Sequence, residues 1–181
     1  RSIAAALTRS GHEVVVLGRT AASLEATVAA GDAAAWRTVD VADAESLARG
    51  LEGLAVDILV NNAGIADSAP FARSDLAFFR RLMAVNFESV VTATQAVLPG
   101  MVERGFGRVV SVASVAGLKG YPYVSAYCAS KHAVVGLTRA LAQEVARTGV
   151  TVNALCPGYV DTDLVHDGAA RISLKTGRPA A

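Results

Sequence analysis

Short apolar runs that alternate with helical segments are the feature of this sequence that most restricts its fold. The runs are bounded by glycine, proline or polar residues, as is typical of strands buried on both faces. They occupy residues 13–18, 35–38, 57–60, 108–112 and 150–155. The segments between them have helical patterns, at residues 1–10, 21–30, 42–54, 74–98 and 127–137. The alternation predicts an α/β fold, a Rossmann-like doubly wound parallel sheet in three layers.

Composition indicates one domain over residues 1–181 and excludes several partners. With 52% hydrophobic and 18% charged residues, the chain is neither disordered nor long enough for two domains. It has no apolar run of ~20 residues, which argues against a membrane partner. A net charge of +1 and 6% aromatic residues argue against nucleic acid. Two cysteines without histidine partners at metal spacing predict no metal site and a cytoplasmic protein.

Polar or glycine-rich residues follow five of the predicted strands. In doubly wound sheets, ligands bind beyond the carboxyl ends of the strands. We therefore expect five segments to line one crevice: residues 18–20, 40–41, 61–64, 114 and 157–159.

Tyr127 and Lys131 lie four residues apart in a predicted helix, so both side chains share one face. A tyrosine has a pKa of ~10, and a lysine cation at ~5 Å would stabilise the phenolate by ~3 kcal/mol. We therefore expect Lys131 to lower the pKa of Tyr127, and Ser114 to hold the carbonyl oxygen that Tyr127 protonates. By itself Tyr-x-x-x-Lys is more often an ordinary helix pair with its polar ends in water.

Together these motifs resemble the short-chain dehydrogenase/reductase family over nearly the whole chain. The resemblance implies a catalytic tetrad of Asn86, Ser114, Tyr127 and Lys131. It implies that Tyr127 donates the proton, Ser114 orients the substrate, Lys131 binds the nicotinamide ribose and Asn86 anchors a water relay. The alternative for Asn86 is a packing role.

The same resemblance implies a set of cofactor-binding residues in addition to Tyr127 and Lys131. It places part of the motif at residues 61–64 beside the cofactor, a segment after the last strand at the carboxamide of the nicotinamide, and two residues at the adenine ring. These residues are Asn62, Ala63, Gly64, Pro157, Gly158, Thr162, Asp40 and Val41. The alternative is that the segments are ordinary turns and loops.

In the family, the residues at the end of the second strand determine whether NAD or NADP is bound. An acid there binds the ribose of NAD, whereas a nearby arginine accommodates the 2′-phosphate of NADP. The chain has Gly18 at the acid's position, followed by Arg19. This favours NADP over NAD, because a guanidinium matches phosphate in a bidentate way. The alternative is that Arg19 is a solvated loop residue.

The chain departs from the family at both ends. The family's first strand and glycine-rich phosphate loop have no counterpart, and the only nearby Gly-x-Gly, at residues 105–107, precedes a strand. We therefore expect a chain truncated at both ends, a sheet in two pieces, and no nucleotide binding by these residues alone.

The substrate is the least constrained part of the interpretation. Residues 101–107 and 130–157 are similar to β-ketoacyl and polyketide ketoreductases, which implies a β-keto or β-hydroxy acyl thioester. Steroids, sugars and small secondary alcohols remain alternatives, as does a catalytically silent Rossmann-fold scaffold. Tyr121 and Tyr159 are candidates for the substrate pocket or for packing. The apolar helices around Asn86 and after Tyr127 imply a homodimer or homotetramer.

Overall fold

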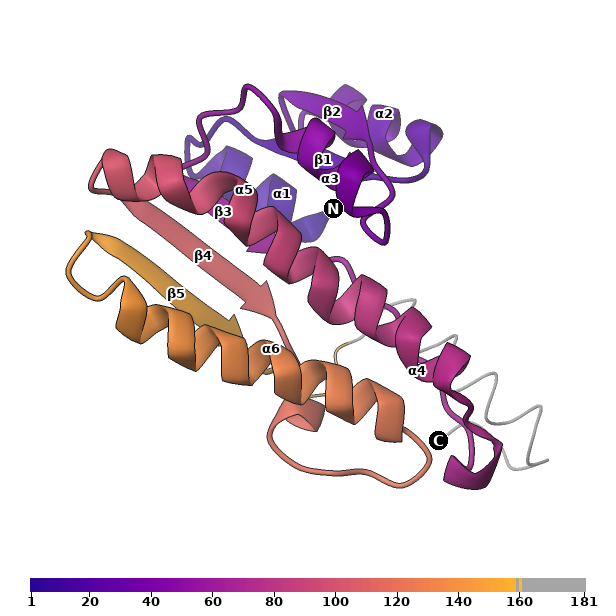
Figure 1. The fold of residues 1–181 in the computed structure, drawn as a ribbon. Coiled ribbons are helices and arrows are strands. Elements are labelled where there is room, and N and C mark those ends of the chain that lie inside the picture. Colours follow the sequence, from indigo (N-terminus) through magenta and orange to yellow (C-terminus); the bar gives the residue numbers. More distant parts are fainter. Residues whose placement is uncertain (159, 161–181) are drawn as a thin grey trace. The chain divides into compact units, whose positions relative to one another are not determined.

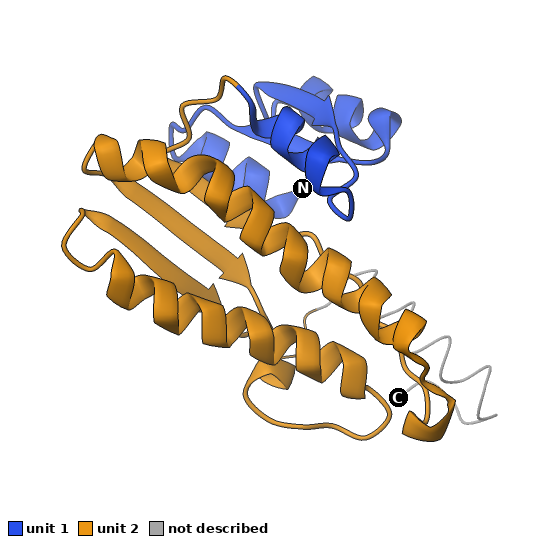
Figure 2. Ribbon diagram, viewed as in Figure 1, with its two compact units in different colours: residues 1–52 blue, residues 53–181 orange. Residues whose placement is uncertain are grey.

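The structure, a computed structural model, describes residues 1–158 and residue 160. The chain forms two compact units, residues 1–52 (unit 1) and residues 53–181 (unit 2), which are coloured separately in Figure 2. Among the described residues, each unit has its own parallel sheet, of two strands in unit 1 and three in unit 2. The prediction of a parallel α/β fold with its sheet in two pieces is therefore confirmed.

Unit 1 is a small α/β unit in which two parallel strands alternate with helices. Its elements are α1 (Ser2–Arg9), β1 (Val15–Gly18), α2 (Ala21–Ala29), β2 (Ala35–Thr38) and α3 (Ala44–Leu51). Asp43 caps α3 by accepting hydrogen bonds from the backbone of Glu45 and Ser46. Helix α3 lies so close to the end of β2 that a Cβ on Gly50 would overlap the buried side chain of Val39.

Unit 2 contains a three-stranded sheet and the longest helices. Its elements are β3 (Ile58–Asn61), the 3₁₀ turn η1 (Phe71–Arg73), α4 (Leu76–Met83), the π-helical turn η2 (Ala84–Glu88), α5 (Ser89–Glu103), β4 (Gly107–Val112), the 3₁₀ turn η3 (Val115–Gly117), α6 (Ser125–Glu144) and β5 (Val150–Leu155). The strand order is β3-β4-β5. Figure 1 shows α5 and α6 running along the sheet.

The core of unit 2 lies between this sheet and the two long helices. Every second residue of β4 is buried, beginning at Gly107, and Val109 pairs with the buried Val152 of β5. Val134 and Val135 of α6 form a buried cluster with Val90 of α5. Because β3, β4 and β5 pair in parallel, their carboxyl ends lie at one edge of the sheet.

The helical region before β4 differs from the predicted single helix over residues 74–98. It begins at Leu76, passes through a π-helical turn and continues beyond Pro99 to Glu103. The fully buried Met101 accounts for the extra turn, because it packs against Gly107, where a Cβ would lie 2.6 Å from it. Burying such a side chain contributes ~1.5–3 kcal/mol, which offsets at least half of the ~3 kcal/mol that proline costs inside a helix.

The remaining helices and strands lie where the sequence placed them, and most of their ends differ by three residues or fewer. Helix α3, for example, is shorter at both ends than the predicted segment over residues 42–54. Helix α6 is the exception, because it begins at Ser125 and continues to Glu144, well beyond the predicted segment over residues 127–137. Within the described part of the chain, no helix has the length and apolar character needed to cross a membrane.

Candidate active site

Helix α6 carries Tyr127 and Lys131 on one face, as predicted. The lysine side chain is buried, at 5% exposure, and its Nζ lies 5.8 Å from the centroid of the Tyr127 ring. The tyrosine is half-buried. The pair is therefore not the exposed helix pair that Tyr-x-x-x-Lys most often forms.

Ser114 is brought to Tyr127 by a close contact between η3 and α6. The serine follows β4 and caps η3, where its Oγ accepts a hydrogen bond from Ala116 N at 3.1 Å. At the end of the same turn, a Cβ on Gly117 would lie 2.7 Å from the backbone oxygen of Lys131, so glycine permits the approach. The Ser114 hydroxyl also forms a hydrogen bond with the Tyr127 side chain. The structure therefore brings Ser114, Tyr127 and Lys131 together.

The Lys131 amine is anchored to the end of the neighbouring strand. Its Nζ donates a 2.7 Å hydrogen bond to the carbonyl oxygen of Val112, the last residue of β4. Burial lowers the pKa of Lys131 to about 8, and the nearby Cys156 thiol opposes that shift. Lys131 is thus a cation at neutral pH that loses its proton under mildly alkaline conditions.

The pKa of Tyr127 is shifted in the opposite direction to the one expected from the sequence. Burial raises the pKa of the phenol above its usual value, and the hydrogen bond with Ser114 lowers it only in part. Lys131 does not reverse this, because its own pKa of about 8 means that it is neutral at any pH where a phenolate would form. The prediction that Lys131 makes Tyr127 more acidic is therefore wrong for this arrangement, and the phenol holds its proton at neutral pH.

Asn86 is buried, at 1% exposure, in the π-helical turn between α4 and α5. Its Oδ1 accepts a 2.8 Å bond from Ile65 N, and its Nδ2 donates to Ile65 O at 2.9 Å and to Ser130 Oγ at 3.0 Å. Both N–H groups of the amide are therefore engaged by protein atoms. A water relay through Asn86, which the family resemblance implies, would have to use its oxygen or its backbone.

The loop after β3 runs beside the amine of Lys131. Asn61 anchors the start of the loop, donating from Nδ2 to Ser111 Oγ at 3.3 Å and to Thr94 Oγ1 at 3.5 Å. A Cβ on Gly64 would lie 3.4 Å from Asn86 Oδ1 and 3.5 Å from Lys131 Nζ. The exposed stretch of Asn62, Ala63 and Gly64 therefore borders the candidate site.

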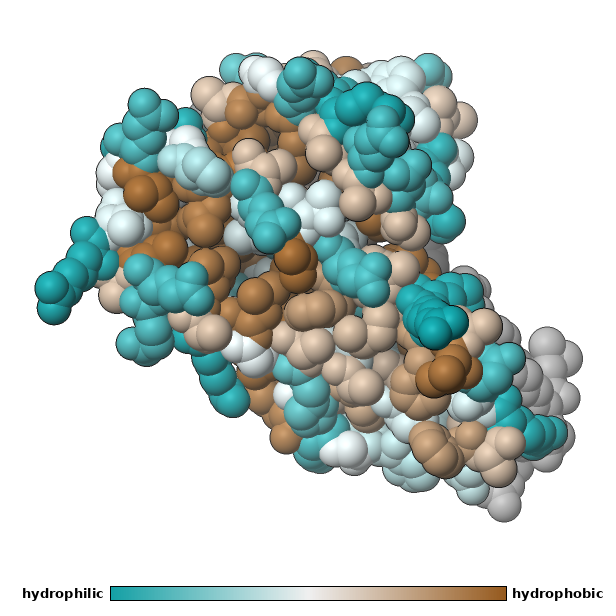
Figure 3. Space-filling view, in the orientation of Figure 1, coloured by the Kyte–Doolittle hydropathy of each residue, from teal (hydrophilic) through white to brown (hydrophobic). Residues whose placement is uncertain are grey.

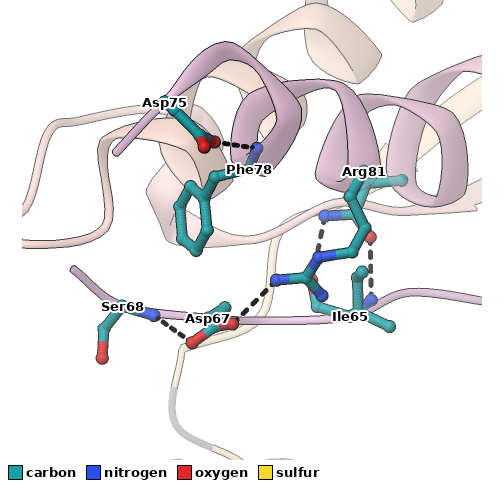
Figure 4. A network of polar contacts seen from close by, with 7 residues as sticks. Ile65, Asp67, Ser68, Asp75, Phe78 and Arg81 are labelled. Carbon is teal, nitrogen blue, oxygen red and sulfur yellow. Dashed lines mark hydrogen bonds and ion pairs between the residues drawn. The ribbon is translucent and has the colours of Figure 1, made fainter. Parts of the chain in front are cut away.

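Further along, the same loop is fastened to helix α4. Figure 4 shows the hydrogen bonds on the Ile65 backbone and the ion pair from Arg81 Nη2 to Asp67 Oδ2, at 2.8 Å. Asp75 caps α4 by accepting from Phe78 N at 2.8 Å. The loop is thus held at its beginning, middle and end.

The segment after β5 is tied to the turn that carries Ser114. Val115 N donates to Pro157 O at 3.0 Å, which continues the pairing of β4 with β5 beyond the strands. Pro157 is half-buried and Gly158 is exposed. Thr162 and Tyr159, which the sequence also suggested, lie outside the described residues.

The predicted adenine-side residues belong to unit 1. Arg19 follows β1 and is exposed, and no acid among the described residues lies within ion-pair distance of it. Asp40 follows β2, the parallel partner of β1, and its Oδ1 accepts a 3.0 Å bond from Ala42 N, with Val41 between them. Arg19, Asp40 and Val41 therefore gather at the paired strand ends of their own unit.

The donors around Lys131 fit a ribose diol. Among the described residues, the Val112 carbonyl is the acceptor of this amine, so two of its three N–H groups can reach hydroxyl oxygens. The bordering Gly64 carries no side chain, and its neighbours Asn62 and Ala63 are exposed. The residues present therefore suit the nicotinamide half of a dinucleotide.

Three participants were not identified from the sequence. They are the hydroxyl of Ser130, the carbonyl of Val112 and the backbone of Ile65. Only Ser130 carried a signal, as a small polar residue directly before Lys131 in a helix whose buried residues are mostly apolar.

Comparison with known proteins connects this geometry to an enzyme family. The family model described as short chain dehydrogenase matches residues 1–172. The chain is 41% identical over 169 residues to the "Inactive 2-(S)-hydroxypropyl-CoM dehydrogenase 2" of Xanthobacter autotrophicus, covering 90% of this chain and 74% of that protein. It is 45% identical over 111 residues to an "Acetoacetyl-CoA reductase" of Rhizobium meliloti, covering 61% and 46%.

A solved structure agrees with the sequence comparisons. The structure of F189W actinorhodin polyketide ketoreductase with NADPH has a TM-score of 0.92 at 35% identity, covering 98% of this chain and 72% of that one. The matching segments span from 43% to 74% of the length of the curated relatives.

Proposed function

We propose that this chain, which belongs to the short chain dehydrogenase family, is part of an NADP-dependent oxidoreductase that interconverts a ketone and a secondary alcohol. The observation that carries the proposal is the contact of the Ser114 hydroxyl with the Tyr127 phenol beside the buried Lys131 amine. A proton donor, a carbonyl-orienting hydroxyl and a cation within one half-buried site are the groups that reduction of a ketone requires.

In the direction of reduction, Tyr127 is the general acid. Its raised pKa keeps the phenol protonated at neutral pH, so a proton is available when negative charge develops on the carbonyl oxygen. Ser114 already bonds to the same phenol, so its hydroxyl lies where it can bond to that oxygen and orient the carbonyl. A nicotinamide nucleotide, when bound, supplies the hydride.

Lys131 holds the ribose and supplies positive charge. Its amine is fixed by the Val112 carbonyl at 2.7 Å, which orients the remaining N–H groups. Because the burial-lowered pKa is about 8, the amine is charged at neutral pH and neutral at high pH. Asn86 acts indirectly, by holding the backbone of Ile65 in the loop that borders the amine.

The preference for NADP rests on Arg19. The exposed guanidinium follows β1, where Gly18 replaces the acid that would bind the ribose of NAD. With no acid beside it among the described residues, the guanidinium is available to a phosphate. The ketoreductase of similar structure contains NADPH, which supports the same choice.

A β-keto acyl thioester is the substrate class that we propose. The support comes from relatives whose names include acetoacetyl-CoA reductase and putative ketoacyl reductase. Lys119 and Tyr121, in the loop before α6, are candidates for the pocket, with the Lys119 Nζ 5.1 Å from the centroid of the Tyr121 ring. Steroids, sugars and small secondary alcohols are the competing substrates.

We test the function by measuring NADPH oxidation with acetoacetyl-CoA on the full-length protein. The Tyr127→Phe variant keeps the ring but removes the proton donor, and we expect its kcat to fall by about 10²–10⁴-fold. Equal activity of the two proteins would show that Tyr127 is not the acid. Activity with a steroid or sugar but not with the thioester would support the proposed reaction and reject the proposed substrate class.

A catalytically silent scaffold is the alternative function. It is favoured by one observation, the 41% identity to a relative whose name calls it inactive. The assembled Ser114, Tyr127 and Lys131 argue against it, because a scaffold does not need them together. Wild-type protein that binds NADPH but oxidises none with any ketone would support the scaffold.

We also propose a homo-oligomer in the cytoplasm. Figure 3 shows apolar side chains gathered on the surface of unit 2, and exposed apolar residues include Val102 in the last turn of α5 and Phe106 directly before β4. Cys128 and Cys156 are both free thiols, as suits a reducing compartment. A monomeric mass of the full-length protein by light scattering would reject the oligomer.

A further inference from the structure

The hydroxyl of Ser130 is a completely buried link between two segments of unit 2. The residue lies between Tyr127 and Lys131 in α6 and is 0% exposed. Its Oγ donates to the backbone oxygen of Tyr127 at 2.8 Å and accepts from Asn86 Nδ2 at 3.0 Å. One hydroxyl therefore joins the helix that carries the acid to the π-helical turn 44 residues earlier.

The direction of these bonds fixes the orientation of the Asn86 amide. A hydroxyl has a single proton, and Ser130 gives it to the Tyr127 carbonyl, so toward Asn86 it can only accept. The Asn86 nitrogen must therefore face Ser130, and its oxygen must face Ile65 N. Removing the hydroxyl would leave a buried N–H without an acceptor.

The fixed side-chain amide of Asn86 in turn holds the loop beside Lys131 in position. Asn86 holds both the N–H and the carbonyl of Ile65, at 2.8 and 2.9 Å. The preceding residue, Gly64, lies against Asn86 Oδ1 and Lys131 Nζ. Displacement of the amide would therefore move the loop that borders the amine.

We propose that Ser130 is a positioning residue, which acts through Asn86 to hold the Ile65 loop in place against Lys131. Its kinetic consequences rest on the proposed function, but its structural consequence does not. Ser130 is 0% exposed and, among the described residues, its hydroxyl bonds only to Asn86 and the Tyr127 backbone, so its effect is on the geometry of the site.

Thr138 provides a matched control in the same helix. It is also buried, at 8% exposure, and its Oγ1 donates to the backbone oxygen of Val134 at 2.8 Å. It thus repeats the helix-internal bond of Ser130 but has no link to Asn86. The Thr138→Val variant separates loss of a buried helix hydroxyl from loss of the link.

The first measurement is hydrogen exchange at the Ile65 amide, whose acceptor is the Asn86 side chain. In the full-length protein we expect Ser130→Ala to raise the exchange rate at Ile65 by about tenfold, because Asn86 loses one of its fixed partners. Thr138→Val should leave that rate within about twofold of the wild type. Ser130→Cys, which keeps the shape but accepts hydrogen bonds poorly, serves if the alanine variant does not fold.

The second measurement is a kinetic double-mutant cycle between Ser130→Ala and Asn86→Ala. If Ser130 acts through Asn86, the double variant should have the kcat/KM of Asn86→Ala alone, within about twofold. Unchanged Ile65 exchange in both Ser130 variants, or fully additive losses in the cycle, would overturn the proposal. Faster exchange at Ile65 in a protein without reductase activity would support the positioning role and reject the proposed function instead.

Discussion

Unit 1 and unit 2 both place polar side chains near the carboxyl ends of their parallel strands, but they hold these side chains in opposite ways. In unit 1, Arg19 is exposed and no acid among the described residues pairs with it. In unit 2, Lys131 and Asn86 are buried and bonded to the protein. A flexible, exposed charged side chain can adjust its position to bind a phosphate, whereas proton transfer requires groups whose positions are already fixed.

The contrast has an energetic side. Within the described residues, no buried side-chain nitrogen or oxygen lacks a hydrogen-bond partner. The site of unit 2 nevertheless carries a cost, because a buried ammonium loses its hydration. That cost appears as the lowered pKa of Lys131. Unit 1 has no comparable cost at Arg19, since water still surrounds the guanidinium.

The largest expected effect concerns the buried amine. The folded pKa of Lys131 is about 8 against 10.5 for the free side chain, so between these values the unfolded chain binds more protons than the folded one. Stability should therefore rise with pH, by about 3 kcal/mol over the window from pH 8 to 10.5. Chemical denaturation at each pH measures it, with Lys131→Met as the variant that lacks this rise.

Above pH 10 a second group opposes this trend. Burial raises the pKa of Tyr127, so the folded chain keeps a proton that the unfolded chain releases, and stability falls again. The rise in stability that is due to Lys131 should therefore be measured between pH 8 and 10. An identical slope in wild type and Lys131→Met would mean that the amine is hydrated, and the contrast between the units would fail.

The next effect concerns the exposed charge of unit 1. We expect Arg19→Ala to weaken NADPH binding by about 10- to 100-fold, the worth of a charge-assisted bond to phosphate, and NADH binding by less than about threefold. Calorimetry on the full-length protein measures both. Arg9→Ala, which removes an exposed arginine at the end of α1, is the control. Equal losses for the two nucleotides would reject the choice of NADP.

The smallest effect tests the space beside the amine. A methyl on Gly64 would meet Asn86 Oδ1 and Lys131 Nζ at 3.4 and 3.5 Å, which is close but does not force the backbone to move. We expect Gly64→Ala to raise the KM for NADPH by about three- to tenfold while kcat changes little. Gly136→Ala, on α6 where a Cβ would meet nothing within 4 Å, should leave KM unchanged. A fall in kcat with constant KM would instead place Gly64 in the chemical step.

The sequence predicted most elements of the fold and the helix face that Tyr127 and Lys131 share. The spacing of Tyr127 and Lys131 determines that they share a helix face, whatever the rest of the chain does. Val150–Leu155 was recognised with both ends correct, because an apolar run between two turns has few other structures. The two separate sheets followed from the strand order.

What could not be predicted depends on contacts between distant segments. The link from Asn86 to Ser130 needs the π-helical turn, which has no known signature in Ala84–Glu88. The direction of the Tyr127 pKa depends on how deeply the phenol is buried, which spacing does not reveal. The Lys131 anchor is a backbone carbonyl, that of Val112, and any residue there would offer the same atom.

The strand pairing in the two sheets also determines how much chain entropy is lost when the paired strands come together during folding. In unit 1, Val15 pairs with Ala35, whereas in unit 2, Ile58 pairs with Arg108, so the second connection encloses a much longer loop. Chain entropy makes the longer closure more expensive by roughly 0.8 kcal/mol. The pairing of β3 with β4, which lead into the candidate site, is thus a contact between distant residues, and such contacts form slowly during folding. Helices that form early within the intervening segment make this pairing faster.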